Sequence, residues 1–331
     1  MVTTIAVAGG TRGIGRAIAE AINGKENYDV KVFSRSPNPA LEAENGIPII
    51  AIDYTDVDSM TKVLEDNKID TVISTLFVTF DGKPQVNLIH AAEASKHTRR
   101  FIPSIWALTT FLKHFSNNRH KLTNGFTNRQ VGERQMTIGQ SKLDAVEALE
   151  KSTLEYTLFY VGYFLDFWGY PRVQSYQRQN LIVVDIEYNR AAIPGDGNTP
   201  VTFTHTFDVA EFVAASLDLP SWEKESYVIG ESITWNEFLR LAEEVKGEKF
   251  EVTHDSLDLL LSGQITELPS HPSLYSQMPK DQIQTLFATF GVWFEKGLFE
   301  LKPTNKTLNE VFPKIHARTV KEVLEAGWGK Q

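Results

Sequence analysis

The sequence predicts an α/β protein built on a doubly wound parallel sheet. Short apolar runs with strand character alternate with runs of helical period through the first half of the 331-residue chain. A glycine-rich turn joins the first strand to the first helix, and the strict alternation ends after Phe164. We therefore expect one domain over residues 1–165 and a smaller α+β region over residues 166–331 that is interleaved with it.

The first strand, turn and helix form a motif that is typical of phosphate binding. Residues 4–8 are apolar, and residues 9–15 read Gly-Gly-Thr-Arg-Gly-Ile-Gly. Gly9 would let the chain turn tightly, Gly13 would let a pyrophosphate approach the backbone, and Gly15 would let the helix pack on the sheet. The helix start adds free N–H groups and a positive dipole end. The pattern favours a Rossmann-type dinucleotide site over a simple tight turn, with contacts from Gly9, Thr11, Arg12, Gly13 and Ile14.

The end of the second strand predicts which dinucleotide binds. Residues 30–33 form that strand, and Ser34, Arg35 and Ser36 follow it. NAD-binding proteins usually place a carboxylate here for the ribose 2′-hydroxyl, and this chain has none. Because a guanidinium matches a phosphate, Arg35 with Arg12 favours NADP(H) over NAD(H). The alternative is that Arg35 is an ordinary solvated surface arginine.

The remaining elements of the first half follow in order along the chain. A buried strand is expected at 47–52, then a helix at 58–66, a strand at 71–74, a helix at 86–94 and a strand at 100–103. Residues 105–135 are expected to be irregular and to form a lid or binding loop, because loops of that length usually carry function. A helix at 139–150 and a sixth strand at 156–159 complete the sheet.

The second half carries weaker signals. A strand is expected at 181–186 and a turn at 194–197, and capping pairs predict three helix starts, at Asp208 with Glu211, Thr234 with Glu237, and Thr319 with Glu322. The aromatic residues of 257–300 favour core packing over a pocket. His205 is expected to be a core or surface histidine rather than a pocket residue.

Ligands of parallel sheets bind at the carboxyl ends of the strands, which predicts further contacts. Asp53 and Tyr54 should lie by the adenine, while Thr75 and Leu76, with Phe77, should flank the ribose and nicotinamide. Contacts to the nicotinamide face are expected from Tyr160, Gly162 and Tyr163. The expected substrate neighbours are Phe80, Trp106, Tyr160, Tyr163, Phe164 and Trp168. This aromatic, nearly uncharged set favours an apolar, aromatic or polycyclic substrate.

Composition excludes several other classes of function. A net charge of −9 argues against nucleic acid or an anionic membrane as the partner. Cysteine is absent, and the eight histidines form no metal-binding motif, so we expect no metal. No Gly-x-Ser-x-Gly elbow indicates a hydrolase. With no leader and no long apolar stretch in the sequence, we expect a cytoplasmic protein, monomeric or homodimeric.

The chain resembles the atypical short-chain reductases, namely the NmrA-like family and the isoflavone and phenylcoumaran benzylic ether reductases. The resemblance is carried by residues 9–15, Arg35, residues 100–104, Lys142 with Thr157 fifteen positions later, and residues 207–210 and 232–238. Short-chain dehydrogenases usually carry Tyr-x-x-x-Lys on the helix after the fifth strand. Here Lys142 is present, but Ile138 stands in place of the tyrosine.

The resemblance implies that a lone lysine acts in proton transfer beside the nicotinamide, which places this role on Lys142. Desolvation would lower its pKa toward neutrality. The alternatives are that Lys142 only holds the ribose hydroxyls or that it is a surface lysine. We expect an NADPH-dependent reductase of a small apolar metabolite in specialised metabolism. The rival interpretations are a dinucleotide-binding redox sensor without turnover, and an isomerase or cyclase that keeps its cofactor.

Overall fold

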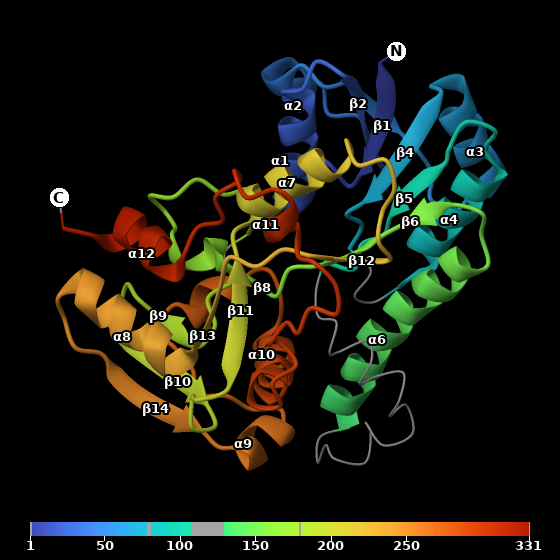
Figure 1. Cartoon of the computed structure of the whole chain (residues 1–331). Helices are drawn as coiled ribbons and strands as arrows, with labels where there is room; N and C mark the ends of the chain where they lie inside the picture. Colours follow the sequence, from blue (N-terminus) through green and yellow to red (C-terminus); the bar gives the residue numbers. More distant parts are fainter. Residues whose placement is uncertain (1, 78–80, 107–128, 179, 331) are drawn as a thin grey trace.

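A six-stranded parallel sheet forms the centre of the N-terminal half (Figure 1). The computed structural model describes residues 2–77, 81–106, 129–178 and 180–330. The strands are β1 (Thr3–Ala8), β2 (Tyr28–Ser34), β3 (Ile49–Ala51), β4 (Ile69–Ser74), β5 (Arg100–Ile102) and β6 (Glu155–Tyr156). Their order is β3-β2-β1-β4-β5-β6, and every neighbouring pair is parallel. This order confirms the predicted doubly wound Rossmann-type fold.

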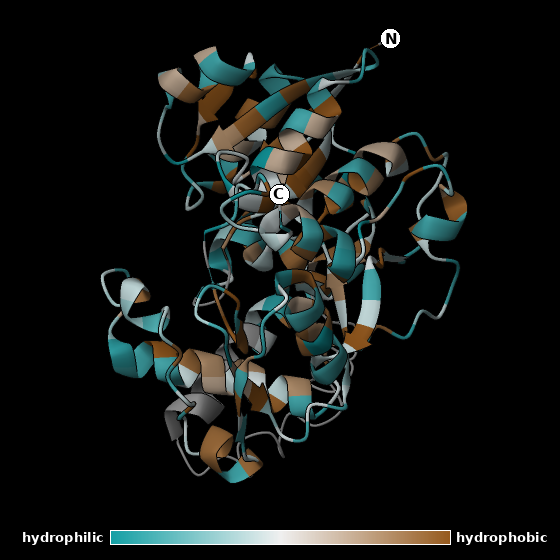
Figure 2. Ribbon diagram, turned by 90° about the vertical axis from the view of Figure 1, so that its left-hand side faces the viewer, coloured by the Kyte–Doolittle hydropathy of each residue, from teal (hydrophilic) through white to brown (hydrophobic). Residues whose placement is uncertain are grey.

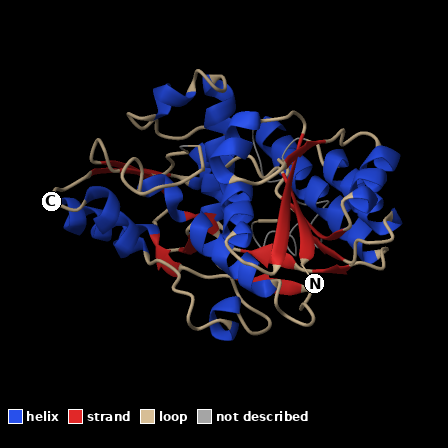
Figure 3. Ribbon diagram, turned by 90° about the horizontal axis from the view of Figure 1, so that it is seen from above, coloured by secondary structure: helices blue, strands red, loops and turns tan. Residues whose placement is uncertain are grey.

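Helices cover both faces of this sheet, as the view from above shows (Figure 3). The helices that connect its strands are α1 (Gly13–Asn23), α2 (Pro39–Asn45), α3 (Val57–Asp66), α4 (Lys83–Ala94) and α6 (Arg129–Glu150). Successive residues of β1 point to opposite faces, so Ala6 and Ala8 join the core under α3, α4 and α6, while Ile5 and Val7 join the core under α1. In Figure 2 the strands in the upper part are largely brown, while the helices around them carry both brown and teal bands, as expected for helices with one apolar face.

The second half builds small sheets and a group of helices. One sheet joins β8 (Tyr163–Phe164), β11 (Pro200–Thr204) and β13 (Glu231–Thr234), and another joins β9 (Val184–Asp185), β10 (Arg190–Pro194) and β14 (Glu251–Asp255). The helices and 3₁₀ turns are η1 (Leu165–Trp168), α7 (Thr206–Ser216), α8 (Trp235–Lys246), α9 (Leu257–Leu261), η2 (His271–Leu274), α10 (Lys280–Glu295), α11 (Leu308–Val311) and α12 (Val320–Trp328).

Two elements of the second half return to pack against the N-terminal half. Helix α7 packs against α1, and their buried apolar residues share one core (Figure 1). Strand β12 (Glu225–Tyr227) pairs in parallel with β7 (Leu158–Tyr160), which directly follows β6 in the chain. Because α7 and β12 make these contacts, we propose that residue 165 marks the point where the chain passes from one region to the next. It is not a boundary between two domains that fold independently.

Several predicted elements differ from the structure. The expected buried strand at 47–52 is the short edge strand β3, whose residues are half-buried or exposed because no strand of the described residues pairs with its outer side. Helix α6 begins at Arg129, inside the stretch that was expected to be irregular up to residue 135. Residues 107–128, where the predicted lid lies, are outside the described residues. The strand expected at 181–186 is reduced to β9, since Val183 has a φ of 66° that breaks an extended run.

The helix caps were predicted with partial success. Thr234 with Glu237 and Thr319 with Glu322 form the reciprocal capping boxes that were expected. The predicted cap at Asp208 is wrong, because α7 begins earlier and His205 caps it by accepting a hydrogen bond from the Phe207 amide. The aromatic stripe is core, as expected: Phe287, Trp293, Phe294 and Phe299 are buried.

Candidate cofactor and active site

The glycine turn is shaped by close contacts with the end of β4. Gly9 has a φ of 84°, and a Cβ on it would lie 2.8 Å from the Thr75 hydroxyl oxygen. A Cβ on Gly15 would lie 2.7 Å from the Gly9 carbonyl oxygen. The Thr75 hydroxyl donates to the Ala8 carbonyl at 2.8 Å, which locks β4 to the turn. Only glycine fits Gly9 and Gly15, because φ and space both exclude a side chain at the first position and space excludes it at the second.

The turn presents free hydrogen-bond donors at the start of α1. Within the described part of the chain, the backbone amides of Thr11, Arg12 and Ile14 have no hydrogen-bond acceptor. Such amides, with the positive end of the helix dipole, bind anions such as a pyrophosphate. The Gly13 amide differs, since it donates to the Tyr176 carbonyl at 2.9 Å.

Two unpaired guanidinium groups lie near this turn. Arg12 and Arg35 are exposed, and neither makes an ion pair or hydrogen bond with any residue that the structure describes. Arg35 lies close enough to Tyr54 to act on its phenol, although burial dominates and raises the pKa of Tyr54. Ser36 is exposed beside Arg35. Arg12 and Arg35 therefore offer positive charge to a 2′-phosphate, and no carboxylate among the described residues neutralises that charge.

Asp53 follows β3 and is held by its own turn. Its Oδ1 accepts from the Thr55 amide at 2.8 Å and from the Thr55 hydroxyl at 2.7 Å, and these bonds lower its pKa. The carboxylate is therefore charged and fixed in direction. Tyr54 is buried and donates to the Phe33 carbonyl at 3.3 Å.

A buried glutamine that the sequence analysis missed joins the ends of β4 and β5. Gln85 Oε1 accepts from the Ser74 hydroxyl at 2.8 Å and from the Ser104 amide at 2.6 Å. Its Nε2 is buried without a partner among the described residues. Leu76 is half-buried here, and Phe77 is 71% exposed, as suits residues that were predicted to flank a ligand. No sequence motif marks Gln85, because its role depends on two strands that meet only in the fold.

Lys142 lies on α6 beside the connection that follows β4. A Cβ on Gly82 would lie 3.0 Å from the Cα of Ser141, so this connection touches α6 one residue before Lys142. Lys142 is half-buried, and its ammonium has no hydrogen bond or ion pair with the residues described. Burial lowers the pKa of Lys142 to about 8. A lysine with this pKa can donate a proton near neutral pH.

Two of the predicted aromatic residues are half-buried, and the others that the structure describes belong to the core. Trp106 is half-buried, donates to the Ser74 carbonyl at 3.0 Å and packs on Phe159, so it stays at the strand ends. Phe164 is half-buried, and Phe80 lies outside the described residues. Tyr163 is buried among aromatic rings, and its hydroxyl accepts from Asn180 at 3.3 Å. These rings belong to Phe167, Trp168, Phe290, Phe294 and Phe299.

Three of the expected contacts have structural roles instead. Trp168 is fully buried against Phe203 and Phe238 and donates to the Val184 carbonyl at 2.9 Å, so it offers no surface to a substrate. Tyr160 is buried and packs against Tyr227. Gly162 has a φ of 70°, and a side chain at this position would clash with the Thr202 backbone. No local pattern in the sequence indicates which way these side chains point after the sixth strand.

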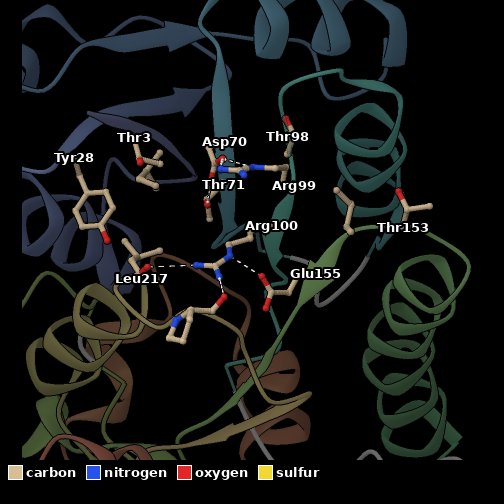
Figure 4. A pocket seen from close by; sticks show the side chains of 13 residues that line it. Thr3, Tyr28, Asp70, Thr71, Thr98, Arg99, Arg100, Thr153, Glu155 and Leu217 are labelled. Atoms are coloured by element: carbon tan, nitrogen blue, oxygen red, sulfur yellow. Dashed lines mark hydrogen bonds and ion pairs between the residues drawn. The ribbon is translucent and has the colours of Figure 1, made fainter. Parts of the chain in front are cut away.

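A polar cavity of about 590 Å³ lies at the opposite edge of the sheet, at the amino ends of the strands (Figure 4). Its charged side chains are already paired: Arg99 with Asp70, and Arg100 with Glu155. It is thus remote from the glycine turn and is not the dinucleotide site. Among the residues described, no cluster of His, Asp or Glu could hold a metal ion, and no helix has the length and apolarity needed to cross a bilayer.

Comparisons with known proteins agree with this geometry. A family model described as NAD(P)H-binding matches residues 9–220. The chain is 34% identical to Oxidoreductase BOA1 of Botryotinia fuckeliana, over 94% of this chain and 95% of that protein. It is 24% identical to phenylcoumaran benzylic ether reductase TP7 of Nicotiana tabacum, over 97% of both. The solved structure described as AtPrR2 with NADP+ and (+)pinoresinol has a TM-score of 0.73 at 19% identity and covers 98% of each chain.

The fold and the glycine turn define a nicotinamide dinucleotide-dependent oxidoreductase. The chain belongs to the NAD(P)H-binding family, within the NmrA-like and isoflavone reductase-like group that it resembles. The predictions of the oxidoreductase class and of a nicotinamide cofactor are therefore confirmed.

Proposed function

We propose that this protein is an NADPH-dependent reductase of a small apolar, aromatic or polycyclic metabolite in specialised metabolism, with Lys142 in proton transfer. The observation that carries the proposal is Lys142, a half-buried residue whose ammonium is unpaired within the described structure, beside the connection that follows β4. The similar structure described as AtPrR2 with NADP+ and (+)pinoresinol supports a small organic substrate beside the cofactor.

The residues at the strand ends fit the cofactor. The free amides of Thr11, Arg12 and Ile14 would hold the pyrophosphate, and the guanidinium groups of Arg12 and Arg35 would hold the 2′-phosphate, with Ser36 beside them. Asp53 and Tyr54 would lie along the adenine. We expect Thr75 and Leu76 along the ribose and nicotinamide end, with Tyr160, Gly162 and Tyr163 behind them as support.

Lys142 would act at the reacting end of the substrate. A nicotinamide cofactor, when bound, would supply a hydride for a polarised C=C, C=N, C=O or benzylic carbon. The Lys142 ammonium, directly or through water, gives a proton to the substrate atom that becomes electron-rich, and takes one back from solvent afterwards. Trp106 and Phe164 would contact the apolar body of the substrate, with Tyr163 behind them, and exclude water from the reacting carbon.

Calorimetry with both coenzymes tests the phosphate preference. NADPH should bind at least tenfold more tightly than NADH, because charge-assisted hydrogen bonds to the 2′-phosphate are worth about 1.5–3 kcal/mol. Arg35→Ala should remove most of this difference and leave NADH binding unchanged. The control Arg240→Ala removes an exposed arginine of α8, far from the glycine turn. Tighter binding of NADH by the wild type would overturn the preference.

Turnover tests the reductase itself. Purified protein with NADPH and a panel of lignan-type, flavonoid-type and other aromatic substrates should consume NADPH and release reduced product. Product without NADPH loss would instead indicate the isomerase or cyclase. Binding of NADPH with no turnover on any substrate, together with a protein partner whose affinity follows the redox state of the coenzyme, would indicate the sensor.

A further inference from the structure

A short segment of the C-terminal half lies directly on the glycine turn. The Tyr176 carbonyl accepts a hydrogen bond from the Gly13 amide at 2.9 Å. The Gln177 side-chain amide lies over Gly13, with its Oε1 3.1 Å from the place that a Cβ would take. We name residues 175–177 the strap. The strap therefore crosses the point where the sequence places the pyrophosphate.

Contacts with α1 hold the strap on its outer side. The Tyr176 hydroxyl donates to Glu20 at 2.5 Å, and the Arg16 guanidinium carbon lies 4.1 Å from the centre of the Tyr176 ring. The same ring packs edge-on against Phe207 at the start of α7. Arg16 also pairs with Glu20, so the Tyr176 side chain, the Arg16 guanidinium and the Glu20 carboxylate form one set of contacts on α1.

A buried carboxylate holds the strap on its inner side. Asp166 is fully buried, and its Oδ1 accepts from the Ser175 hydroxyl at 2.6 Å. Its Oδ2 accepts from the Thr206 amide at 2.8 Å. The Ser175 hydroxyl in turn accepts from the Gln177 amide N–H at 3.0 Å. Buried charge-assisted bonds of this kind fix the direction of the groups they join, so Gln177 is aimed at the turn by the interior of the protein.

The Gln177 side chain has unused hydrogen-bonding capacity at this place. Within the described part of the chain, neither its oxygen nor its nitrogen has a hydrogen-bond partner. It lies beside the turn whose Thr11, Arg12 and Ile14 amides are also free. A side-chain amide supplies two N–H donors without charge, and it can rotate to present them to a phosphate oxygen.

We propose that Gln177 is a pyrophosphate ligand of the bound dinucleotide, and that Asp166 and Tyr176 are the positioning residues that hold it there. This inference rests on the proposed NADP(H) site. The Gln177 amide would donate to a pyrophosphate oxygen beside the free α1 amides. The pyrophosphate is common to both coenzymes, so this contact stabilises NADPH and NADH equally, unlike Arg35.

Calorimetric titration of the full chain with NADPH and with NADH tests this assignment. Gln177→Glu replaces the donor with a carboxylate and should weaken both coenzymes by at least about tenfold, since a hydrogen bond is lost and like charges approach. Gln177→Ala should weaken both by about threefold to tenfold. Gln264→Glu makes the same charge change in an exposed loop of the C-terminal half and should leave both affinities unchanged. Thermal unfolding of each apo variant checks that the fold is intact.

The outcomes separate this inference from the proposed function. An equal loss for NADPH and NADH in Gln177→Glu, with wild-type stability, supports the assignment. Wild-type affinity in both Gln177 variants overturns it, as does tighter binding, which would mean that the strap obstructs the site. A loss confined to NADPH would assign Gln177 to the 2′-phosphate and overturn it as well. If the wild type itself binds neither coenzyme, the proposed function fails first.

Discussion

Lys142 joins two properties that usually exclude each other in a folded protein. The residue is half-buried, yet within the described part of the chain no carboxylate neutralises its ammonium. Burying an unpaired charge destabilises the folded protein. The lowered pKa of Lys142 reduces this destabilisation, because the ammonium loses its proton more readily. Such an arrangement is typical of functional groups rather than of structural ones, because a purely structural position would be more stable with an apolar side chain.

Replacing Lys142 with methionine should therefore separate activity from stability. Lys142→Met should reduce kcat by at least about a hundredfold, the usual contribution of a positioned acid, and leave NADPH affinity within a few-fold. The free energy of unfolding should rise by about 1–2 kcal/mol at pH 7, because the unpaired charge is removed. Steady-state kinetics and urea denaturation measure these, with Lys62→Met, at an exposed lysine, as control. A variant with wild-type kcat would refute the proton-transfer role.

The pH dependence of turnover should report the same group. The Lys142 pKa is lowered to about 8, so the lysine is mostly protonated at pH 7 and can act as an acid. We expect kcat to be constant below pH 8 and to fall above it, as the folded-state lysine loses its proton. The stability gained by Lys142→Met should be fully present below pH 8 and shrink toward pH 10.5, because there the folded wild type no longer carries the charge. A profile without a limb near pH 8 would contradict this assignment.

At the scale of single residues, sequence predicts what local geometry decides. Gly9 and Gly15 were readable because a tight turn and a close helix leave no room for a side chain. Trp168 was misplaced because its direction depends on β11 and α8, which lie far along the chain. Gln177 was not recognised for the same reason, since its place over Gly13 exists only after the strap has folded back onto α1.

At the scale of elements, Arg100 links strands to a distant helix end. Its Nε donates to Glu155 of β6 at 2.6 Å, and its Nη1 donates to the Leu217 carbonyl, just beyond α7, at 3.3 Å (Figure 4). Its Nη2 donates to the carbonyls of Leu219 and Pro220 at 3.1 and 3.0 Å. Glu155 also accepts from the Trp222 amide at 2.6 Å. A planar guanidinium can satisfy these acceptors together, which an ammonium cannot.

Removing this link should destabilise the fold without touching the site. Arg100→Ala leaves a half-buried Glu155 and unsatisfied carbonyls, so it should lower the free energy of unfolding by about 3 kcal/mol. Arg100→Lys should fall between that variant and the wild type. Urea denaturation measures both, while NADPH affinity of the folded fraction should not change. Stability equal to wild type in Arg100→Ala would show that the link is only a surface contact.

Sequence predicts elements better than their connections. The strands of the parallel sheet were located because their apolar runs are short and bounded, and the two capping boxes because their bonds are local. The edge position of β3 was missed because exposure depends on the strand order, which an apolar run does not contain. The cap of α7 was misplaced because a histidine is an unusual cap, and Asp208 is used instead to bind the Arg318 amide at 2.8 Å.

At the scale of the whole molecule, the two halves complete each other. The apolar face of α1, with Ile18 and Ile22 fully buried, packs against α7 from the second half. Strand β12 covers the edge of β7. Neither contact can form within residues 1–165, so a fragment of that length would expose an apolar helix face and a free strand edge.

The full chain should therefore unfold as one cooperative unit. Scanning calorimetry should show a single transition whose calorimetric and van't Hoff enthalpies agree, although a chain of this length usually divides into independent domains. NADPH at about 100 times its dissociation constant should raise the stability of the whole transition by about 2.7 kcal/mol, because the ligand binds only the native state. A fragment of residues 1–165 should show no cooperative transition. Two transitions, of which only the first responds to NADPH, or a folded fragment, would instead establish two separate domains, because the contacts of α7 with α1 and of β12 with β7 would then be dispensable to the N-terminal half.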